Sequence, residues 1–239
     1  MKRQPLSHVV SGLRYGDAWP STSSWPYAVR FFGLITFATL AGLALGALTR
    51  WIDSLPEGWR SLALIGVPWF GLAFALGALT VRWRTRSGGA AVVGALATLG
   101  AVCGYYGYMH VVEHEANAFY LAHYLTFWLG PALLGGPLFG VAGAVWRGKR
   151  GSMKACAAGL LSAICVGEGG WTTARFLSAH QPVDAVNVAE LALGLALPFL
   201  LVPSRRERLL AYGTTVGLSL CCVGCLWLIA SLLTALNGP

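Results

Sequence analysis

Residues 31–49 read FFGLITFATLAGLALGALT and contain no charged side chain. About 20 apolar residues in a helix cross the hydrocarbon core of a bilayer, which is about 30 Å thick. This stretch is therefore expected to be a membrane-spanning helix, and six further apolar runs of similar length follow it. The seven predicted spans are residues 28–49, 60–81, 88–112, 118–146, 153–177, 184–203 and 209–236.

The composition of the whole chain agrees with this interpretation. Of its 239 residues, 56% are hydrophobic and 11% are charged, whereas soluble domains average about 25% charged residues. This excludes a soluble enzyme and a nucleic-acid-binding protein. The runs lack the alternating ten-residue segments of a transmembrane β-barrel. We therefore expect an all-α membrane bundle of residues 28–236, preceded by a cytoplasmic tail of residues 1–27.

Basic residues are distributed unevenly between the predicted connections. Of the 17 Lys and Arg residues, all but Arg50, Arg60 and Arg175 lie on one of the two sides that the seven spans define. Lys and Arg accumulate on the cytoplasmic side of membrane proteins. The pattern predicts a cytoplasmic N-terminus and a C-terminus outside, and it explains the net charge of +8 as a consequence of topology.

Two carboxylates, Glu168 and Glu190, lie inside predicted spans. An ionisable side chain in hydrocarbon costs a few kcal/mol or more, so each one needs a partner or a polar cavity. Arg175 follows Glu168 at i+7 on the same helical face, and an ion pair between them is the structural explanation. The functional explanation is a site for a substrate or an ion.

Further polar and aromatic side chains are expected at the same, outer ends of the spans. Tyr106 and His110 share one stripe of the third span, His123 lies in the outer third of the fourth, and Trp171 follows Glu168. The candidate substrate or ion site comprises Glu168, Glu190, His123, Tyr106, His110, Trp171 and Arg175.

The segment His110-Val-Val-Glu-His114 resembles the H-x-x-E-H motif of the inverted zinc peptidases, in which two histidines bind zinc and the glutamate is a general base. Glu190 falls where the third zinc ligand of that family is expected. The resemblance implies a zinc site of His110, His114 and Glu190. The rest of the chain is unlike those soluble peptidases, and no other cofactor is expected.

Small residues recur at helical spacing in the first span, where Gly42 and Gly46 are four residues apart. Such spacing favours close helix packing, either within the bundle or with a partner membrane subunit. The Gly- and Pro-rich residues 136–143 are similar to a span of the substrate-binding subunits of energy-coupling factor transporters. That similarity implies capture of a solute from the outside face.

Several segments together resemble a known family. They are LGALTRW (45–51), WRSLA (59–63), PWF (68–70), AF (73–74) with Gly77, and GYY (104–106). Over roughly residues 40–110 the chain resembles a family of polytopic actinobacterial membrane proteins of unknown function (DUF6518-like). The resemblance implies a multi-pass protein of a bacterial inner membrane, and it implies no activity.

Three classes of function remain open from the sequence. The first, which we favour, is a solute- or ion-binding, transport-related bundle with an outward-facing polar site. The second is a membrane-embedded enzyme that uses Glu168 and Glu190 as general acid and base on a lipidic, for example isoprenoid, substrate. Seven-span terpene cyclases of similar length are the analogy for it. The third is an accessory subunit without a site.

Overall fold

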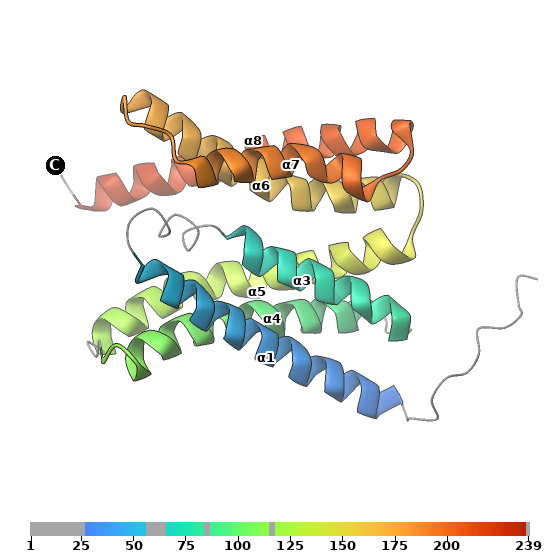
Figure 1. Ribbon diagram of the computed structural model, residues 1–239, viewed down its shortest axis with the longest axis horizontal. Helices are drawn as coiled ribbons and strands as arrows, with labels where there is room; N and C mark the ends of the chain where they lie inside the picture. Colours follow the sequence, from blue (N-terminus) through green and yellow to red (C-terminus); the bar gives the residue numbers. More distant parts are fainter. Residues whose placement is uncertain (1–26, 56–65, 84–86, 115–117, 238–239) are drawn as a thin grey trace, which may run out of the picture.

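The computed structural model describes residues 27–55, 66–83, 87–114 and 118–237 (Figure 1). These residues form seven α-helices and one short 3₁₀ helix, and the described part of the chain contains no strand. The helices are α1 (Tyr27–Asp53), α3 (Val67–Thr80), η1 (Val81–Trp83), α4 (Ser87–Val111), α5 (Ala118–Gly148), α6 (Ser152–Ser178), α7 (Ala185–Leu201) and α8 (Arg205–Asn237). The predicted all-α class is confirmed.

Three helical segments are long and apolar enough to cross a bilayer, which indicates a membrane protein. They are Ala28–Asp53, Ser87–Val111 and Trp128–Gly148, and α3 and α7 are shorter apolar helices. The α3 helix has 14 residues, which rise about 21 Å at 1.5 Å per residue. It begins after Gly66, with Pro68 in its first turn, where a proline ring does not disturb helical hydrogen bonds. The first part of the predicted span 60–81 lies outside the described residues.

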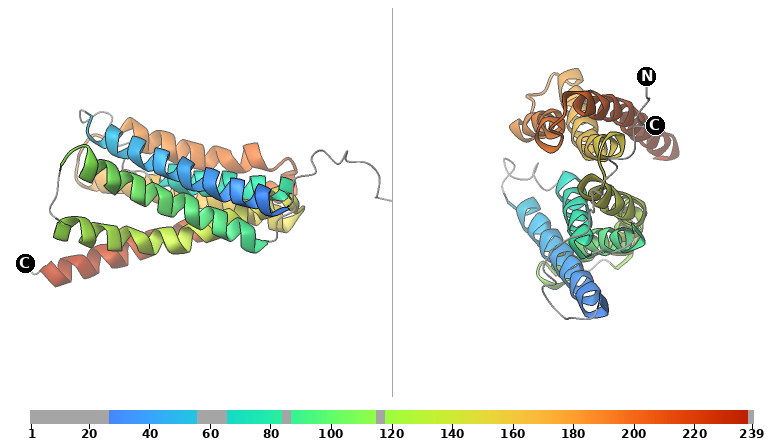
Figure 2. Two further views of the ribbon diagram at one scale, coloured as in Figure 1. Left: turned by 90° about the horizontal axis from the view of Figure 1, so that it is seen from below. Right: turned by 90° about the vertical axis from the view of Figure 1, so that its right-hand side faces the viewer.

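The helices form two groups, which lie one above the other in Figure 1 and are seen end-on in Figure 2. The first group contains α1, α3, α4 and α5, and the second contains α6, α7 and α8. Consecutive helices run in opposite directions. We call the end where α1, α4 and α6 finish the Asp53 end, and the end where α8 begins the Arg205 end.

Glycines bring α1 and α4 together. A Cβ atom added at Gly42 or Gly46 would collide with the α4 backbone at Ala97 or Ala101. A Cβ at Gly104 would collide with the backbone of Leu43. The small-residue spacing in the first span therefore serves packing inside the chain, where it allows the two backbones to approach closely.

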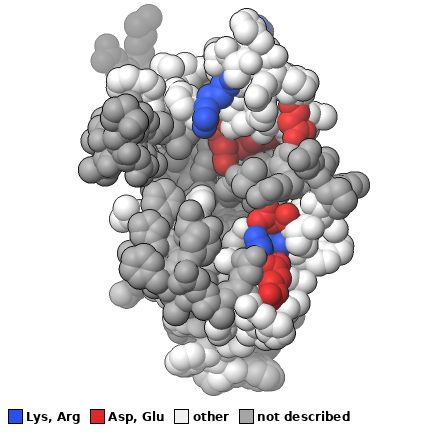
Figure 3. All heavy atoms as spheres, turned by 90° about the vertical axis from the view of Figure 1, so that its left-hand side faces the viewer, with Lys and Arg blue, Asp and Glu red and all other residues white. Residues whose placement is uncertain are grey.

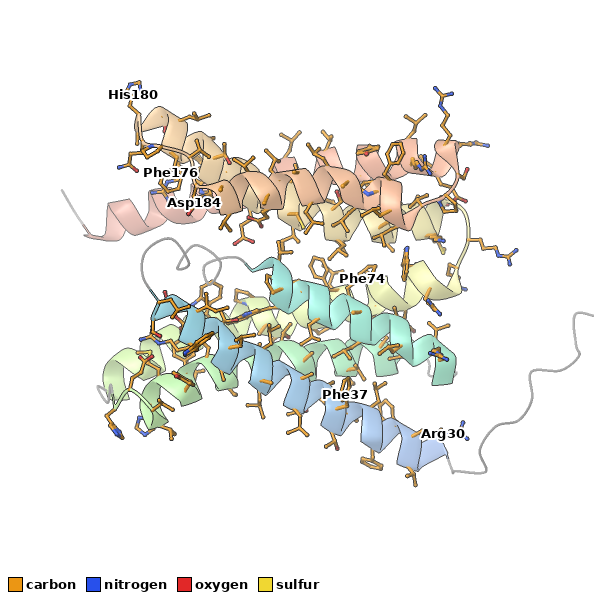
Figure 4. All side chains as sticks on the ribbon, viewed as in Figure 1. Arg30, Phe37, Phe74, Phe176, His180 and Asp184 are labelled. Carbon is orange, nitrogen blue, oxygen red and sulfur yellow. The ribbon has the colours of Figure 1, made fainter. Side chains whose placement is uncertain are left out.

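An apolar cluster joins the two groups. Phe74 on α3 points toward α6 (Figure 4), and the cluster adds Phe139 from α5 and Leu161 from α6. Toward the Arg205 end, the indole N–H of Trp146 on α5 donates to the carbonyl oxygen of Leu201 at 3.1 Å. This apolar interface holds the start of α3 beside α6.

Candidate functional site

The carboxylate of Glu168 lies against the start of α3. The backbone N–H of Gly66 donates to both carboxylate oxygens of Glu168, at N···O distances of 3.0 and 3.1 Å. Gly66 is the N-cap residue of α3 and, being a glycine, has no side chain that could cap the helix. The exposed N–H groups and the dipole of a helix N-terminus favour a negative charge. Glu168 on α6 thus supplies the missing cap across the interface between the two groups.

Glu190 on α7 brings a second carboxyl group to the same place. It is 5% exposed, and within the part of the chain that the structure describes neither of its carboxylate oxygens accepts a hydrogen bond. The carboxyl groups of Glu168 and Glu190 lie close enough to interact electrostatically. A buried polar group without a partner costs about 1–3 kcal/mol. The carboxyl group of Glu190 therefore lowers the stability of the fold, which points to a role other than packing.

Close packing of α6 on α7 sets the position of Glu190. A Cβ atom added at Gly169 would lie 3.0 Å from the backbone nitrogen of Leu191 and 3.4 Å from Oε2 of Glu190. Farther along both helices, the Ser162 hydroxyl donates to the carbonyl oxygen of Gly194 at 2.5 Å. The glycine at position 169 thus leaves room for the Glu190 carboxyl group beside α6.

Of the other predicted site residues, two lie on α6 near Glu168. Trp171 is half-buried and Arg175 is exposed. The ion pair between Glu168 and Arg175 that the sequence suggested is not the arrangement found, because Gly66 binds the carboxylate of Glu168. The nearer polar neighbour on α6 is Thr172, whose hydroxyl donates to the backbone oxygen of Glu168 at 2.9 Å.

The candidate site residues of the third and fourth predicted spans are not described beside Glu168. Tyr106 is 6% exposed and packs with Val102, Met109 and Ala132 in the core of the first group. His110 is exposed near the end of α4. The side chain of His123 lies outside the described residues.

The proposed zinc ligands do not form a metal site. Among the residues that the structure describes, no three His, Cys, Asp or Glu side chains are placed to hold a metal ion. His110, His114 and Glu190 are all described, so this finding includes them. His114 is exposed and has a positive φ of 54° just beyond α4.

A network of charged side chains at the Asp53 end was not identified from the sequence. Arg50 on α1 donates through Nε to both carboxylate oxygens of Glu113, at 3.1 and 3.0 Å, and through an NH₂ group to Asp53 at 2.8 Å. The Tyr105 hydroxyl donates to Asp53 at 2.7 Å. The sequence signal was the i, i+3 spacing of Arg50 and Asp53, which places both on one helical face.

Acidic side chains gather at this end of the molecule. Figure 3 views it directly and shows Asp and Glu in an upper and a lower group, each beside a basic side chain. Every described Asp and Glu except Glu207 lies toward this end. Asp184 caps α7, because its carboxylate accepts a hydrogen bond from the Val186 N–H at 3.0 Å. His180, in the connection between α6 and α7, points away from the bundle (Figure 4).

A small cavity lies beside the start of α3. Its volume is about 20 Å³, which is room for about one water molecule. The residues that line it are Gly66, Trp69, Phe70, Thr98, Trp128, Pro131 and Ala132. A cavity of this size does not hold a solute, so the carboxyl pair and not this cavity is the candidate site.

Comparisons with known proteins place the chain in a family. No curated protein and no solved structure matches it. The sequence profile of a family described as "Family of unknown function (DUF6518)" matches residues 28–232. This range includes every described helix except the last residues of α8 and the first of α1. The chain belongs to this family.

Proposed function

We propose that the chain is a seven-span protein of a bacterial inner membrane that binds a small cation, alone or as the charged group of a solute, at Glu168 and Glu190. In this proposal the cation arrives from outside the cell and its binding is part of transport. The observation that carries the proposal is the buried carboxyl pair, in which neither oxygen of Glu190 accepts a hydrogen bond from any described residue.

The chemistry of the pair favours a cation. Two carboxylates that lie close together repel each other when both are charged, and a cation or a shared proton relieves that repulsion. Hard cations such as Ca²⁺ prefer oxygen ligands, and carboxylates supply them. The backbone N–H of Gly66 donates to Glu168, and among the described residues no donor reaches the carboxyl group of Glu190.

The distribution of charge supports access from outside. Among the described residues, every Lys and Arg except Arg50 and Arg175 lies toward the Arg205 end. By the positive-inside rule that end faces the cytoplasm. The Asp53 end then faces outward, and the acidic side chains gathered there raise the local concentration of cations. Both Glu168 and Glu190 lie in the half of their helices toward that end.

Thermal unfolding of the purified protein tests the proposal. The unfolding temperature is measured in NaCl, KCl, CaCl₂, ethylamine hydrochloride or putrescine dihydrochloride, with ionic strength balanced by N-methyl-D-glucamine chloride. A ligand at about 100 times its Kd stabilises the folded state by about 2.7 kcal/mol. We expect at least one of these cations to raise the unfolding temperature of the wild type and not that of Glu190→Gln.

Glu207→Gln is the matched control, since Glu207 lies in the first turn of α8 at the opposite end. It should respond to the cation as the wild type does. The proposal is wrong if none of the cations stabilises the wild type, or if one stabilises Glu190→Gln to the same extent.

A further inference from the structure

We propose that the bound cation and the backbone N–H of Gly66 compete for the carboxylate of Glu168, so that binding at the site loosens α3 from α6. This inference rests on the proposed cation site and adds a way in which its occupancy changes the contact between the two helix groups.

The first step concerns where the Gly66 N–H lies. It reaches both oxygens of the Glu168 carboxylate at nearly equal distances, 3.0 and 3.1 Å. It therefore lies in front of the carboxylate, between the two oxygens, which is where a cation lies when a carboxylate binds it with both oxygens.

The second step is electrostatic. The start of α3 carries a partial positive charge of about half an elementary charge. A cation held by Glu168 is repelled by that charge at short range. The carboxylate therefore gains little from holding both at once, and a full positive charge is the stronger partner of the two.

The third step concerns which helices each contact joins. The bond from Gly66 to Glu168 joins α3 of the first group to α6 of the second. A cation shared by Glu168 and Glu190 joins α6 to α7, which both belong to the second group. Occupancy thus exchanges a contact between the groups for a contact within one group.

Among the described residues, the other contacts between the groups that we name lie closer to the Arg205 end. They include the bond from Trp146 to the carbonyl oxygen of Leu201 and the packing of Phe74 between α3 and α6. Release of Gly66 from Glu168 would therefore separate the groups at the Asp53 end and leave the Arg205 end in place, as in hinge motions of packed helices.

Radioligand binding separates the site from the competition. Binding of ²²Na⁺ and ⁴⁵Ca²⁺ to the purified wild type and to Glu190→Gln is measured by scintillation proximity. Glu207→Gln is the matched control, because Glu207 lies in the first turn of α8 at the opposite end of the molecule, and it should bind the ion as the wild type does.

We expect the wild type to bind one of these ions and Glu190→Gln to lose that binding. If this result is found and the exchange measurement that follows fails, the coupling is wrong and the site stands. If the wild type binds neither ion and no cation raises its unfolding temperature, both proposals are wrong.

Hydrogen exchange of the wild type tests the competition itself. A saturating concentration of the bound ion should speed exchange at residues 66–71, at the start of α3, and leave residues 76–80 unchanged. Glu190→Gln should show no such effect. Unchanged or slower exchange at residues 66–71, with the ion bound, overturns the inference.

Discussion

Arg50 on α1 binds Glu113, which lies 63 residues later and just beyond α4. The same guanidinium group bonds Asp53, and the Tyr105 hydroxyl bonds Asp53 in turn. The Arg50 and Glu113 side chains are 17% and 20% exposed, so water screens this pair less than it would a fully exposed one. The network joins the end of α1 to the end of α4, beyond the glycines at which the two backbones approach most closely.

Arg50→Lys should destabilise the protein although it keeps the charge. A lysine has no planar fork and cannot bond Glu113 and Asp53 together. We expect a loss of about 1–3 kcal/mol in the free energy of unfolding, which is the scale of hydrogen bonds to charged groups. Arg175→Lys is the control, because Arg175 is exposed. Equal unfolding temperatures for the two variants would show that the network adds no stability.

Glu190→Met should stabilise the protein in the absence of a ligand. It replaces two buried acceptors that no described residue donates to with an apolar side chain of similar length, which removes a penalty of about 1–3 kcal/mol. Unfolding in denaturant, in buffer without metal ions, measures the gain. A lower stability than that of the wild type would mean that the carboxyl group of Glu190 contributes to the fold itself.

Gly46→Ala should destabilise the contact between α1 and α4. Its added Cβ would collide with the Ala101 backbone, and such overpacking costs about 1–3 kcal/mol. Gly33 lies on the same helix with nothing within 4 Å of its added Cβ, so Gly33→Ala should instead gain up to about 1 kcal/mol from helix propensity. Thermal unfolding of the two variants side by side checks the difference, and similar losses in both would contradict it.

Reporter fusions should reveal the orientation of the chain. Alkaline phosphatase fused after residue 237 should be active, because that reporter folds outside the cytoplasm. A green fluorescent protein inserted at residues 149–151, between α5 and α6, should fluoresce, because those residues lie at the basic end. The reverse pattern would invert the topology and would place the Glu168 and Glu190 pair toward the cytoplasm.

The positions of the helices were predictable because each is an apolar run, and the seven described helices lie within the seven predicted runs or within a few residues of them. Glu168 and Glu190 were identifiable for the same reason, as charges inside such runs. The partner of Glu168 was not. The sequence suggested Arg175 on the same helix, whereas the group found is a backbone N–H 102 residues away, and no side-chain pattern reveals a backbone donor.

The Arg50 network illustrates a different limit. Its charged residues lie near the ends of predicted spans, where charged side chains are expected in any membrane protein, so the sequence gives no reason to pair them. Only the packing of α1 on α4 brings Arg50 and Glu113 together. Helical periodicity relates residues a few positions apart, and it contains no information about which two helices become neighbours.

The pairing of α1 with α4 has a consequence for biosynthesis. During synthesis α1 leaves the ribosome before α3, and α3 before α4, so among the described helices the one whose backbone covers Gly42 and Gly46 is the third to be made. Until then the described helix that packs on Gly42 and Gly46 is not yet present. The close contact between the α1 and α4 backbones can therefore form only after both α3 and α4 have been synthesised.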